Sequence, residues 1–213
     1  MSMPILLSKI SNRKKKNILF LISSIGGGGA ERVACRLVSE FSKHHNVYLM
    51  HFNKKENIYY VSPKVNLIPC FIPDIKNMGH YPNIQESNII RILEIEKIRR
   101  RYNINITISF LFSPNIYNVN SSGPGIKIVS ERNDPKGKGE LYYKEMSSSY
   151  KKADKVVFQT NYTKNKFSSE IKRKSVIIPN PICVTFIADK IRKKKIVAVG
   201  RLVPQKNHEL LIK

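Results

Sequence analysis

Apolar and polar positions alternate in a way that predicts a β-α-β unit near the start of the chain. Residues 17–22 form a continuous apolar run, which suits a strand buried on both faces of a parallel sheet. Four glycines follow at 26–29, and apolar side chains then recur at helical spacing over 30–41. A second apolar run at 47–52 completes the unit, because strand, turn, helix and strand in this order make one parallel crossover.

The same alternation continues downstream and predicts the fold class. Residues 88–102 are rich in Ile and Leu and include a basic last turn, which favours a helix. Further strands are expected at 65–68, 104–112, 126–130, 155–158 and 175–178, and further helices at 139–152 and 161–169. Strands that alternate with helices predict an α/β protein, with a Rossmann-like open parallel sheet and helices on both faces.

Changes of composition divide the chain into four segments. Residues 1–16 form a basic lead that we expect to be flexible, and 17–182 hold the strand and helix pattern of one Rossmann-like domain. A polar and basic linker is expected at 183–195, after prolines that cannot join a strand ladder. Residues 196–213 begin a further unit.

This last segment repeats the order of strand and helix. Residues 196–201 are expected to form a buried strand, and 207–213 are expected to form a helix. Because the pattern stops inside the unit, we expect only the truncated start of a second domain.

Composition adds a strongly basic charge. The chain has 38 Lys and Arg against 15 Asp and Glu, a net charge of +23. This surplus is typical of proteins that meet nucleic acid, anionic lipid or a phosphorylated substrate. It is equally typical of a compositional bias that only makes the surface well solvated, since the lysines are spread over most of the chain. The basic runs are not interleaved with aromatic residues, so no nucleic acid partner is expected.

Cysteine usage and the N-terminus indicate a compartment. Cys35, Cys70 and Cys183 lie far apart without metal-ligand spacing, which favours a reducing compartment and no metal. The apolar residues 5–7 precede a basic run, the reverse of the order in a secretory signal. We therefore expect a cytoplasmic protein, with its basic surplus available to hold it peripherally on an anionic membrane surface at the inner face.

The glycine-rich turn at 26–29 is the strongest candidate for a binding site. Such a turn lets backbone approach a ligand, and the helix start offers N–H groups and positive partial charge to a phosphate or a sugar. A turn without a ligand is the alternative. The loop continues Ala30-Glu31-Arg32, which excludes a Walker A motif. Glu31 also takes the place of the third glycine of a dinucleotide fingerprint, so NAD binding is not expected.

Several motifs, in order, resemble those of family 4 glycosyltransferases. They are GGGGAERV at 26–33, SFL at 109–111, SERNDP at 130–135, ADKVVFQT at 153–160, VIIPNPI at 176–182 and VGRLVPQKNHELLI at 199–212. The resemblance runs from about residue 17 to the end of the chain. It implies a GT-B fold, in which two Rossmann-like domains face each other across a cleft, with this chain as the N-terminal, acceptor-side half.

The resemblance implies an activity. Such enzymes transfer a sugar with retention from a nucleotide-sugar, here to a glycan or lipid-linked acceptor in cell-surface polysaccharide assembly. The nucleotide-sugar is a substrate, so no cofactor is expected. The family's paired-glutamate motif (a Glu, seven residues, then another Glu) is absent from the chain, so no catalytic residue is assigned and little activity is expected from the chain alone. The alternative is a non-catalytic basic protein that binds an anionic membrane or nucleic acid.

The resemblance also assigns residues to the substrate site. The residues of the glycine loop and the cleft are Gly27, Gly28, Glu31, Glu131, Arg132 and Asn133. Arg201 and Lys206 match the family's basic pair for the donor diphosphate, where fixed cations stabilise the negative charge that develops.

Two positions leave questions open. Many relatives have a His in place of Arg132, and a guanidinium is always charged, so a His-like role is not carried over. Glu131 and Asp134 suit contacts with sugar hydroxyls and loop capping about equally.

Overall fold

The structure is a computed structural model, and it describes residues 14–54, 58–71, 84–135, 137, 139–181, 197–200, 202 and 207–212. The chain divides into two compact units, Met1–Pro181 and Ile182–Lys213.

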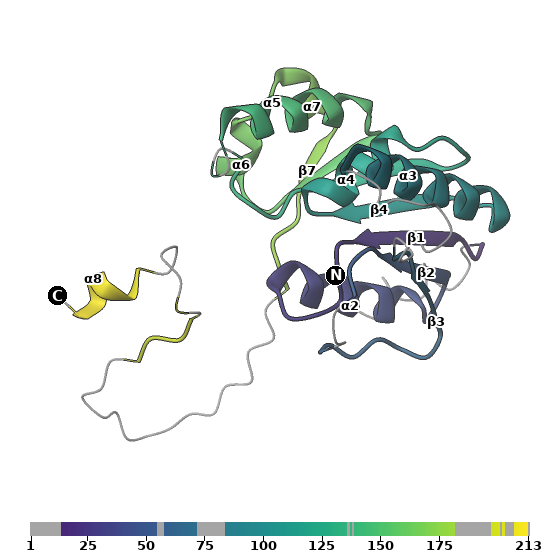
Figure 1. Cartoon of the computed structure of the whole chain (residues 1–213), viewed down its shortest axis with the longest axis horizontal. Coiled ribbons are helices and arrows are strands. Elements are labelled where there is room, and N and C mark those ends of the chain that lie inside the picture. Colours follow the sequence, from purple (N-terminus) through teal and green to yellow (C-terminus); the bar gives the residue numbers. More distant parts are fainter. Residues whose placement is uncertain are drawn as a thin grey trace, which may run out of the picture. The chain divides into compact units, whose positions relative to one another are not determined.

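A parallel sheet forms the centre of the larger unit. Its strands are β1 (Asn17–Ile22), β2 (Asn46–His51), β3 (Val65–Pro69), β4 (Ile106–Phe110), β5 (Ile126–Ser130), β6 (Lys155–Phe158) and β7 (Ser175–Ile177). Their order in the sheet is β3-β2-β1-β4-β5-β6-β7, and every neighbouring pair is parallel (Figure 1). The direction of winding reverses between β1 and β4. The predicted Rossmann-like open parallel sheet is confirmed.

Helices cover both faces of this sheet. They are α2 (Gly29–Phe41), α3 (Ile84–Arg101), α4 (Phe112–Asn120), α5 (Glu140–Ser149), the 3-10 helix η1 (Tyr150–Lys152), α6 (Asn161–Asn165) and α7 (Ser169–Arg173). Figure 1 shows α2 on one side of β1, with α3 and α4 on the other. The two-sided cover explains why β1 is apolar along its whole length, since residues 18–22 are all buried.

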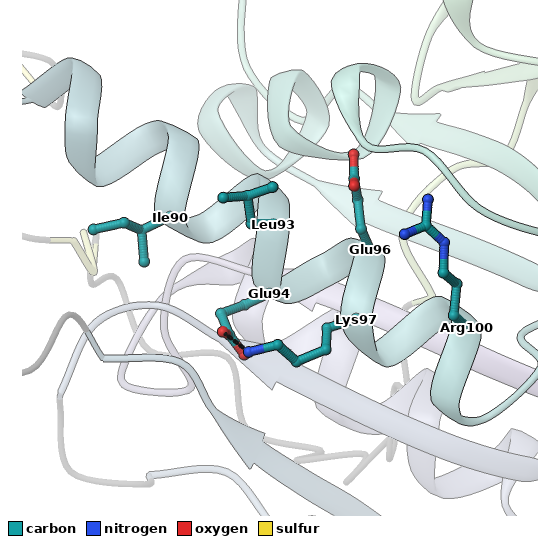
Figure 2. A pocket seen from close by; sticks show the side chains of 6 residues that line it. All are labelled: Ile90, Leu93, Glu94, Glu96, Lys97 and Arg100. Carbon is teal, nitrogen blue, oxygen red and sulfur yellow. Dashed lines mark hydrogen bonds and ion pairs between the residues drawn. The ribbon is translucent and has the colours of Figure 1, made fainter.

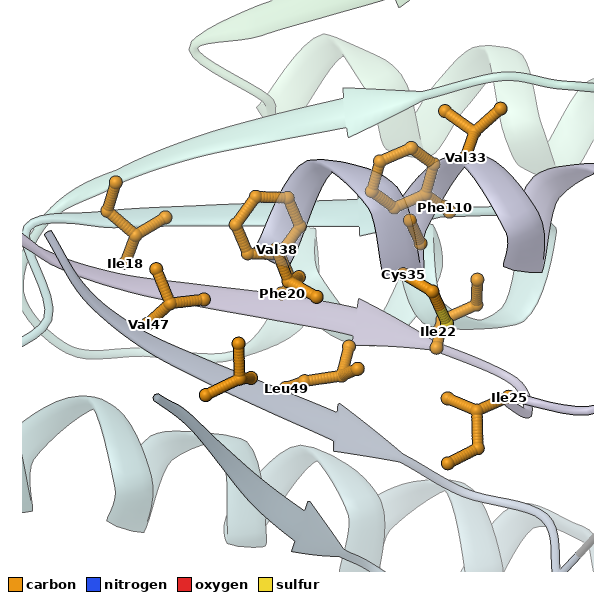
Figure 3. Packing of buried hydrophobic residues seen from close by; sticks show 12 residues of the cluster. Ile18, Phe20, Ile22, Ile25, Val33, Cys35, Val38, Val47, Leu49 and Phe110 are labelled. Atoms are coloured by element: carbon orange, nitrogen blue, oxygen red, sulfur yellow. The ribbon is translucent and has the colours of Figure 1, made fainter. Parts of the chain in front are cut away.

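The core on the α2 side extends to the carboxyl end of the sheet. Phe20 of β1 and Phe110 of β4 stack with ring centroids 6.2 Å apart, and Val33 and Val38 of α2 belong to the same cluster (Figure 3). Each such aromatic or aliphatic side chain contributes about 1.5–3 kcal/mol when fully buried. Phe110 therefore sits on a rigid base.

The strand expected at 104–112 is shorter than predicted. β4 ends at Phe110, and Leu111 follows with a left-handed φ of 72°. Phe112 then begins helix α4, which the sequence pattern did not predict. Pro114 lies in the first turn of α4, where backbone N–H groups have no partner inside the helix, so proline is tolerated there.

Two expected helices differ from those observed. The helix expected at 139–152 ends at Ser149 and continues as η1, and the one expected at 161–169 is two short helices, α6 and α7. Between these two, Phe167 is buried against Phe158 of β6, with ring centroids 4.8 Å apart. Packing of Phe167 into the core thus interrupts the helical path.

A buried arginine fixes α3 to the loop before β5. Arg99 is 0% exposed and donates hydrogen bonds to the carbonyl oxygens of Gly123, Pro124 and Gly125 and to Ser121 Oγ. These bonds satisfy carbonyl groups that would otherwise be left without partners. The loop between α4 and β5 is therefore held rigidly.

In the smaller unit, the structure describes residues 197–200 and 202 and the short helix α8 (His208–Ile212). The strand expected at 196–201 is not formed by the described residues 197–200, and Val197 and Val199 are 78% and 95% exposed. The prediction of a buried strand here was wrong, because no described neighbour supplies ladder hydrogen bonds. Across the described residues, none of the helices combines the length and apolarity of a membrane span.

Candidate functional site

The carboxyl edge of the sheet gathers the sequence motifs of the larger unit. In parallel sheets of this topology, ligands bind where the strand order reverses, outside the carboxyl ends of the strands. Here that point lies between β1 and β4, which are neighbours in the sheet. The glycines at 26–29 follow β1 and lead into α2, so they lie at the carboxyl edge. The segments that follow β4, β5 and β7 begin at the same edge, because all these strands are parallel.

The glycine loop is shaped by its neighbours rather than by backbone strain. Gly28 is the N-cap of α2, with an extended φ of −165° that any residue can adopt. A Cβ there would collide with the Glu31 carboxylate, lying 2.8 Å from its Cδ. A Cβ at Gly27 would come within 3.2 Å of Ile58 Cδ1. The Glu31 side chain therefore folds back over the start of α2, where the helix dipole favours negative charge.

The start of α4 is tied to the end of β5. The Leu111 amide donates to the Ser130 carbonyl at 3.3 Å, and Asn115 Nδ2 donates to the same carbonyl at 3.1 Å. Asn115 Nδ2 also donates to Tyr150 Oη at 2.7 Å, and the Asn115 side chain is fully buried. The corner after β4 thus has a fixed position relative to the loop after β5.

Glu131 is held by hydrogen bonds inside the protein. It is 2% exposed, and Tyr150 Oη donates to its Oε2 at 2.6 Å. Its Oε1 accepts from the backbone N–H groups of Arg132 and Asn133, both at 2.9 Å. Burial, with the nearby Glu131 charge, raises the pKa of Tyr150 well above its ordinary value. The Glu131 carboxylate caps its own loop, and its contact with a sugar hydroxyl stays a prediction.

Arg132 connects three parts of this edge. Its guanidinium carbon lies 5.1 Å from the centroid of the Phe110 ring, a cation–π distance. Its Nη1 donates to Asn180 Oδ1 at 2.6 Å, in the segment after β7. Its Nε is buried without a hydrogen-bond partner. Burial lowers the pKa of Arg132 below the usual range, and the adjacent Glu131 charge opposes this only in part.

The remaining predicted residues have different surroundings. Asn133 is exposed, and its backbone is capped by Glu131. Asp134 Oδ1 accepts from Lys166 Nζ at 2.7 Å, an ion pair at the surface. Arg201 and Lys206 lie outside the described residues.

The structure also assigns contacts that the sequence did not predict. Phe110 and Asn180 stand inside the SFL and VIIPNPI motifs, so the motif match drew attention to them without giving them roles. Tyr150 and Asn115 had no sequence signal, because their importance comes from side-chain contacts between distant segments.

Among the described residues, grooves lie on helices α2 and α3 of the larger unit. One, of about 270 Å³, runs between α2 and the segment after residue 57 and is lined by Arg32, Cys35, Arg36, Ser39, Glu40, Tyr59 and Tyr60. The other, of about 530 Å³, lies along α3 and is lined by Ile90, Leu93, Glu94, Glu96, Lys97 and Arg100 (Figure 2). Of these two, the first lies nearer the glycine loop, because Ile58, next to Tyr59 in the chain, has its side chain where a Cβ at Gly27 would project. Within the described ranges, no three His, Cys, Asp or Glu side chains are grouped to hold a metal ion.

Comparisons with known proteins concern the fold. No family model and no curated protein sequence matches the chain. Among solved structures, the apo form of the lipopolysaccharide outer core galactosyltransferase WaaB superposes with a TM-score of 0.59 and 12% identity, over 79% of this chain and 47% of that one. A sucrose-phosphate synthase from Thermosynechococcus elongatus superposes with a TM-score of 0.50 and 12% identity, over 79% of this chain and 90% of that one.

The chain thus spans about half the length of the galactosyltransferase, 47% of it. At this identity the similarity establishes fold and not activity. The larger unit has the Rossmann-like half-domain fold of GT-B glycosyltransferases.

Proposed function

We propose that this chain is the acceptor-side domain of a family 4 glycosyltransferase. The enzyme would transfer a sugar with retention from a nucleotide-sugar to a glycan or lipid-linked acceptor in cell-surface polysaccharide assembly. One observation carries the proposal: the glycine loop and the loop at 130–133 share the carboxyl edge of a sheet whose structural neighbours are glycosyltransferases. A lipopolysaccharide enzyme among these neighbours supports the choice of a cell-surface glycan.

The residues divide into two roles under this proposal. Gly27 and Gly28 carry no side chains, so a sugar or its phosphates could approach the start of α2 once the flexible Glu31 side chain swings away. The 130–133 loop, fixed by the Glu131 carboxylate, lines the acceptor side. Arg201 and Lys206 would bind the diphosphate of the donor, and their fixed charges would stabilise the leaving group as its bond to the sugar breaks. In this proposal the two cations stabilise the leaving diphosphate, and the reaction uses no metal ion and no cofactor.

An anionic membrane surface is the proposed place of action. Ile58 and Tyr60 are 66% and 75% exposed, beside Arg32 and Arg36 of the groove on α2. Exposed apolar and aromatic side chains next to basic ones suit the interface of an anionic bilayer. Because the Ile58 side chain lies on the side of Gly27 where a Cβ would project, this surface would bring a lipid-linked acceptor next to the glycine loop.

A binding and transfer assay tests the proposal. The chain is titrated with a panel of nucleotide-sugars and of lipid-linked saccharides, and products are analysed for anomeric configuration. The two domains of a GT-B fold share one cleft, so binding of a saccharide acceptor is the primary expected result, and any product keeps the configuration of the donor. Binding of nucleic acid or vesicles with no affinity for any saccharide or nucleotide-sugar would favour the basic binding protein instead.

A further inference from the structure

The charge of Arg132 is only partly compensated within the protein. The side chain is half-buried, and its one hydrogen bond among the described residues goes to the neutral amide of Asn180. The described residues place no carboxylate in an ion pair with it. Glu131 is adjacent in sequence, but hydrogen bonds direct its two oxygens to Tyr150 and to backbone N–H groups. A cation removed from water without a paired anion is costly, and a bound anion would relieve that cost.

The guanidinium is also held in place. It stacks on Phe110, whose ring packs in the same cluster as Val33 from the first half of α2 (Figure 3). Asn180 fixes one of its terminal nitrogens. The Glu131 carboxylate fixes the backbone from which the side chain emerges. A guanidinium that is already positioned loses little further freedom when it binds an oxyanion.

The position of this charge suits a ligand. It lies at the carboxyl end of β4, on the face of the sheet that α2 covers. Ligands of open α/β sheets bind at this edge.

We infer that Arg132 is an oxyanion-binding residue, and that the ligand of this edge presents a phosphate ester to its guanidinium. The inference rests on the proposed function and extends it: the acceptor half of the cleft contributes a fixed positive charge of its own. The phosphate could belong to the diphosphate of the donor or to a phosphorylated acceptor. Both have the same chemistry at Arg132, and the probes below separate them.

The test is a titration of the full chain with inorganic pyrophosphate, followed by NMR of arginine Nε–H groups and by calorimetry. The Arg132 Nε–H signal is expected to shift on binding. Arg132→Gln is expected to weaken pyrophosphate binding at least tenfold, and Arg132→Lys, which keeps the charge, to weaken it less. Arg100→Gln is the matched control, because Arg100 is exposed near the amino edge of β4 and its loss removes the same charge. It is expected to change the affinity less than twofold.

Two further probes identify the source of the phosphate. The affinities of the chain and of Arg132→Gln for uridine diphosphate, glucose 6-phosphate and glucose are compared. A larger loss of affinity for uridine diphosphate on replacing Arg132 supports a donor phosphate. A larger loss for glucose 6-phosphate supports a phosphorylated acceptor. Either result supports the inference.

The inference is overturned if pyrophosphate leaves the Arg132 signal unmoved, or if Arg132→Gln and Arg100→Gln weaken binding equally. The NMR measurement needs no variant, so it decides even if Arg132→Gln fails to fold. None of these readouts depends on sugar transfer. Pyrophosphate binding at Arg132 without any saccharide binding would sink the proposed function alone, whereas saccharide binding with an unmoved Arg132 signal would sink this inference alone.

Discussion

Buried polar side chains determine the shape of the candidate site at the scale of single residues. Asn115 and Tyr150 are fully buried and connect the Ser130 carbonyl to the Glu131 carboxylate. Because the other oxygen of Glu131 caps the next two backbone N–H groups, the loop at 130–133 depends on this chain of hydrogen bonds. Buried networks of this kind are costly when one member is lost.

Replacing Tyr150 by Phe tests the network. The change leaves Glu131 Oε2 buried without its hydroxyl donor, so we expect a loss of about 1–3 kcal/mol in the free energy of unfolding. Urea denaturation measures it. Tyr60→Phe is the matched control, because Tyr60 is 75% exposed and should change stability by less than about 0.5 kcal/mol. Equal stability of the two variants would show that the hydroxyl does not support Glu131.

A histidine at the end of β2 predicts a dependence of stability on pH. His51 is 7% exposed, and desolvation lowers its pKa below the ordinary 6.5. The folded state therefore disfavours the charged ring, while the unfolded state protonates normally. The resulting stability is present above about pH 6.5 and is lost as pH falls from there through the folded pKa.

Denaturation at several pH values between 5 and 8 measures this slope. We expect His51→Gln to flatten it in part, because desolvation also lowers the pKa of His45, which continues to contribute. An unchanged slope in His51→Gln would assign the pH dependence to other groups.

At the scale of elements, two kinds of glycine are distinguished by their surroundings. Gly125 has a φ of 83°, and a Cβ there would lie 2.6 Å from the Asn105 carbonyl oxygen, so backbone would have to move. At Gly28 the Cβ would meet only the end of the flexible Glu31 side chain, which can swing away. The fold thus requires a glycine before β5, whereas a side chain at Gly28 would require only that the Glu31 side chain move.

Alanine at these two positions checks the distinction. Gly125→Ala should lower the free energy of unfolding by about 2–3 kcal/mol, and Gly28→Ala by about 0.5 kcal/mol. Gly28→Ala should still weaken saccharide binding, because its methyl group occupies the approach to the start of α2. Comparable destabilisation by both variants, with saccharide binding intact, would make the loop an ordinary turn without a ligand.

Helices and strands could be predicted from the sequence where the spacing of apolar residues matches the faces that are buried. β1 was predictable because a continuous apolar run matches a strand packed on both faces, and α2 because a helical stripe matches its one buried face. Helix α4 was not, since it is only nine residues long and its first residue, Phe112, continues the apolar run of β4. The strand and the helix are separated by Leu111, which has a left-handed φ. A leucine gives no indication of this conformation in the sequence.

The candidate site was predictable in its location and not in its contacts. Motif order and topology placed the glycine loop and Arg132 at one edge. The roles of Tyr150 and Asn180 depend on side chains that meet across 19 and 48 residues of sequence, and spacing along the chain carries no such information.

At the scale of the whole molecule, the net charge of +23 includes basic residues that lie next to exposed apolar side chains. Basic residues are widespread, but Arg32 and Arg36 stand next to exposed apolar and aromatic side chains beside the glycine loop. Under the proposed membrane role, charge would attract the protein to an anionic bilayer over a Debye length of about 10 Å at 0.1 M salt, and apolar contacts would orient it.

Vesicle sedimentation tests this orientation. Binding to phosphatidylglycerol vesicles should be strong at low salt, weaken as salt rises, and be absent with phosphatidylcholine. Tyr60→Asp should reduce it about tenfold, because it removes an interfacial side chain and adds a negative charge at the surface. Leu141→Asp on α5 introduces the same charge at a residue that is 84% exposed, away from the groove, and should reduce it far less. Equal losses in both variants would mean that binding depends on total charge alone.

The central claim is that the carboxyl edge of the sheet binds the substrates of sugar transfer, and amide chemical shift mapping tests it most directly. The labelled chain is titrated with the nucleotide-sugars and lipid-linked saccharides of the panel. The account predicts that at least one of them shifts amides at 23–28 and 130–133 together, while those lining the groove on α3 stay unchanged. Shifts confined to the α3 groove, or none with any saccharide or nucleotide-sugar, would contradict it.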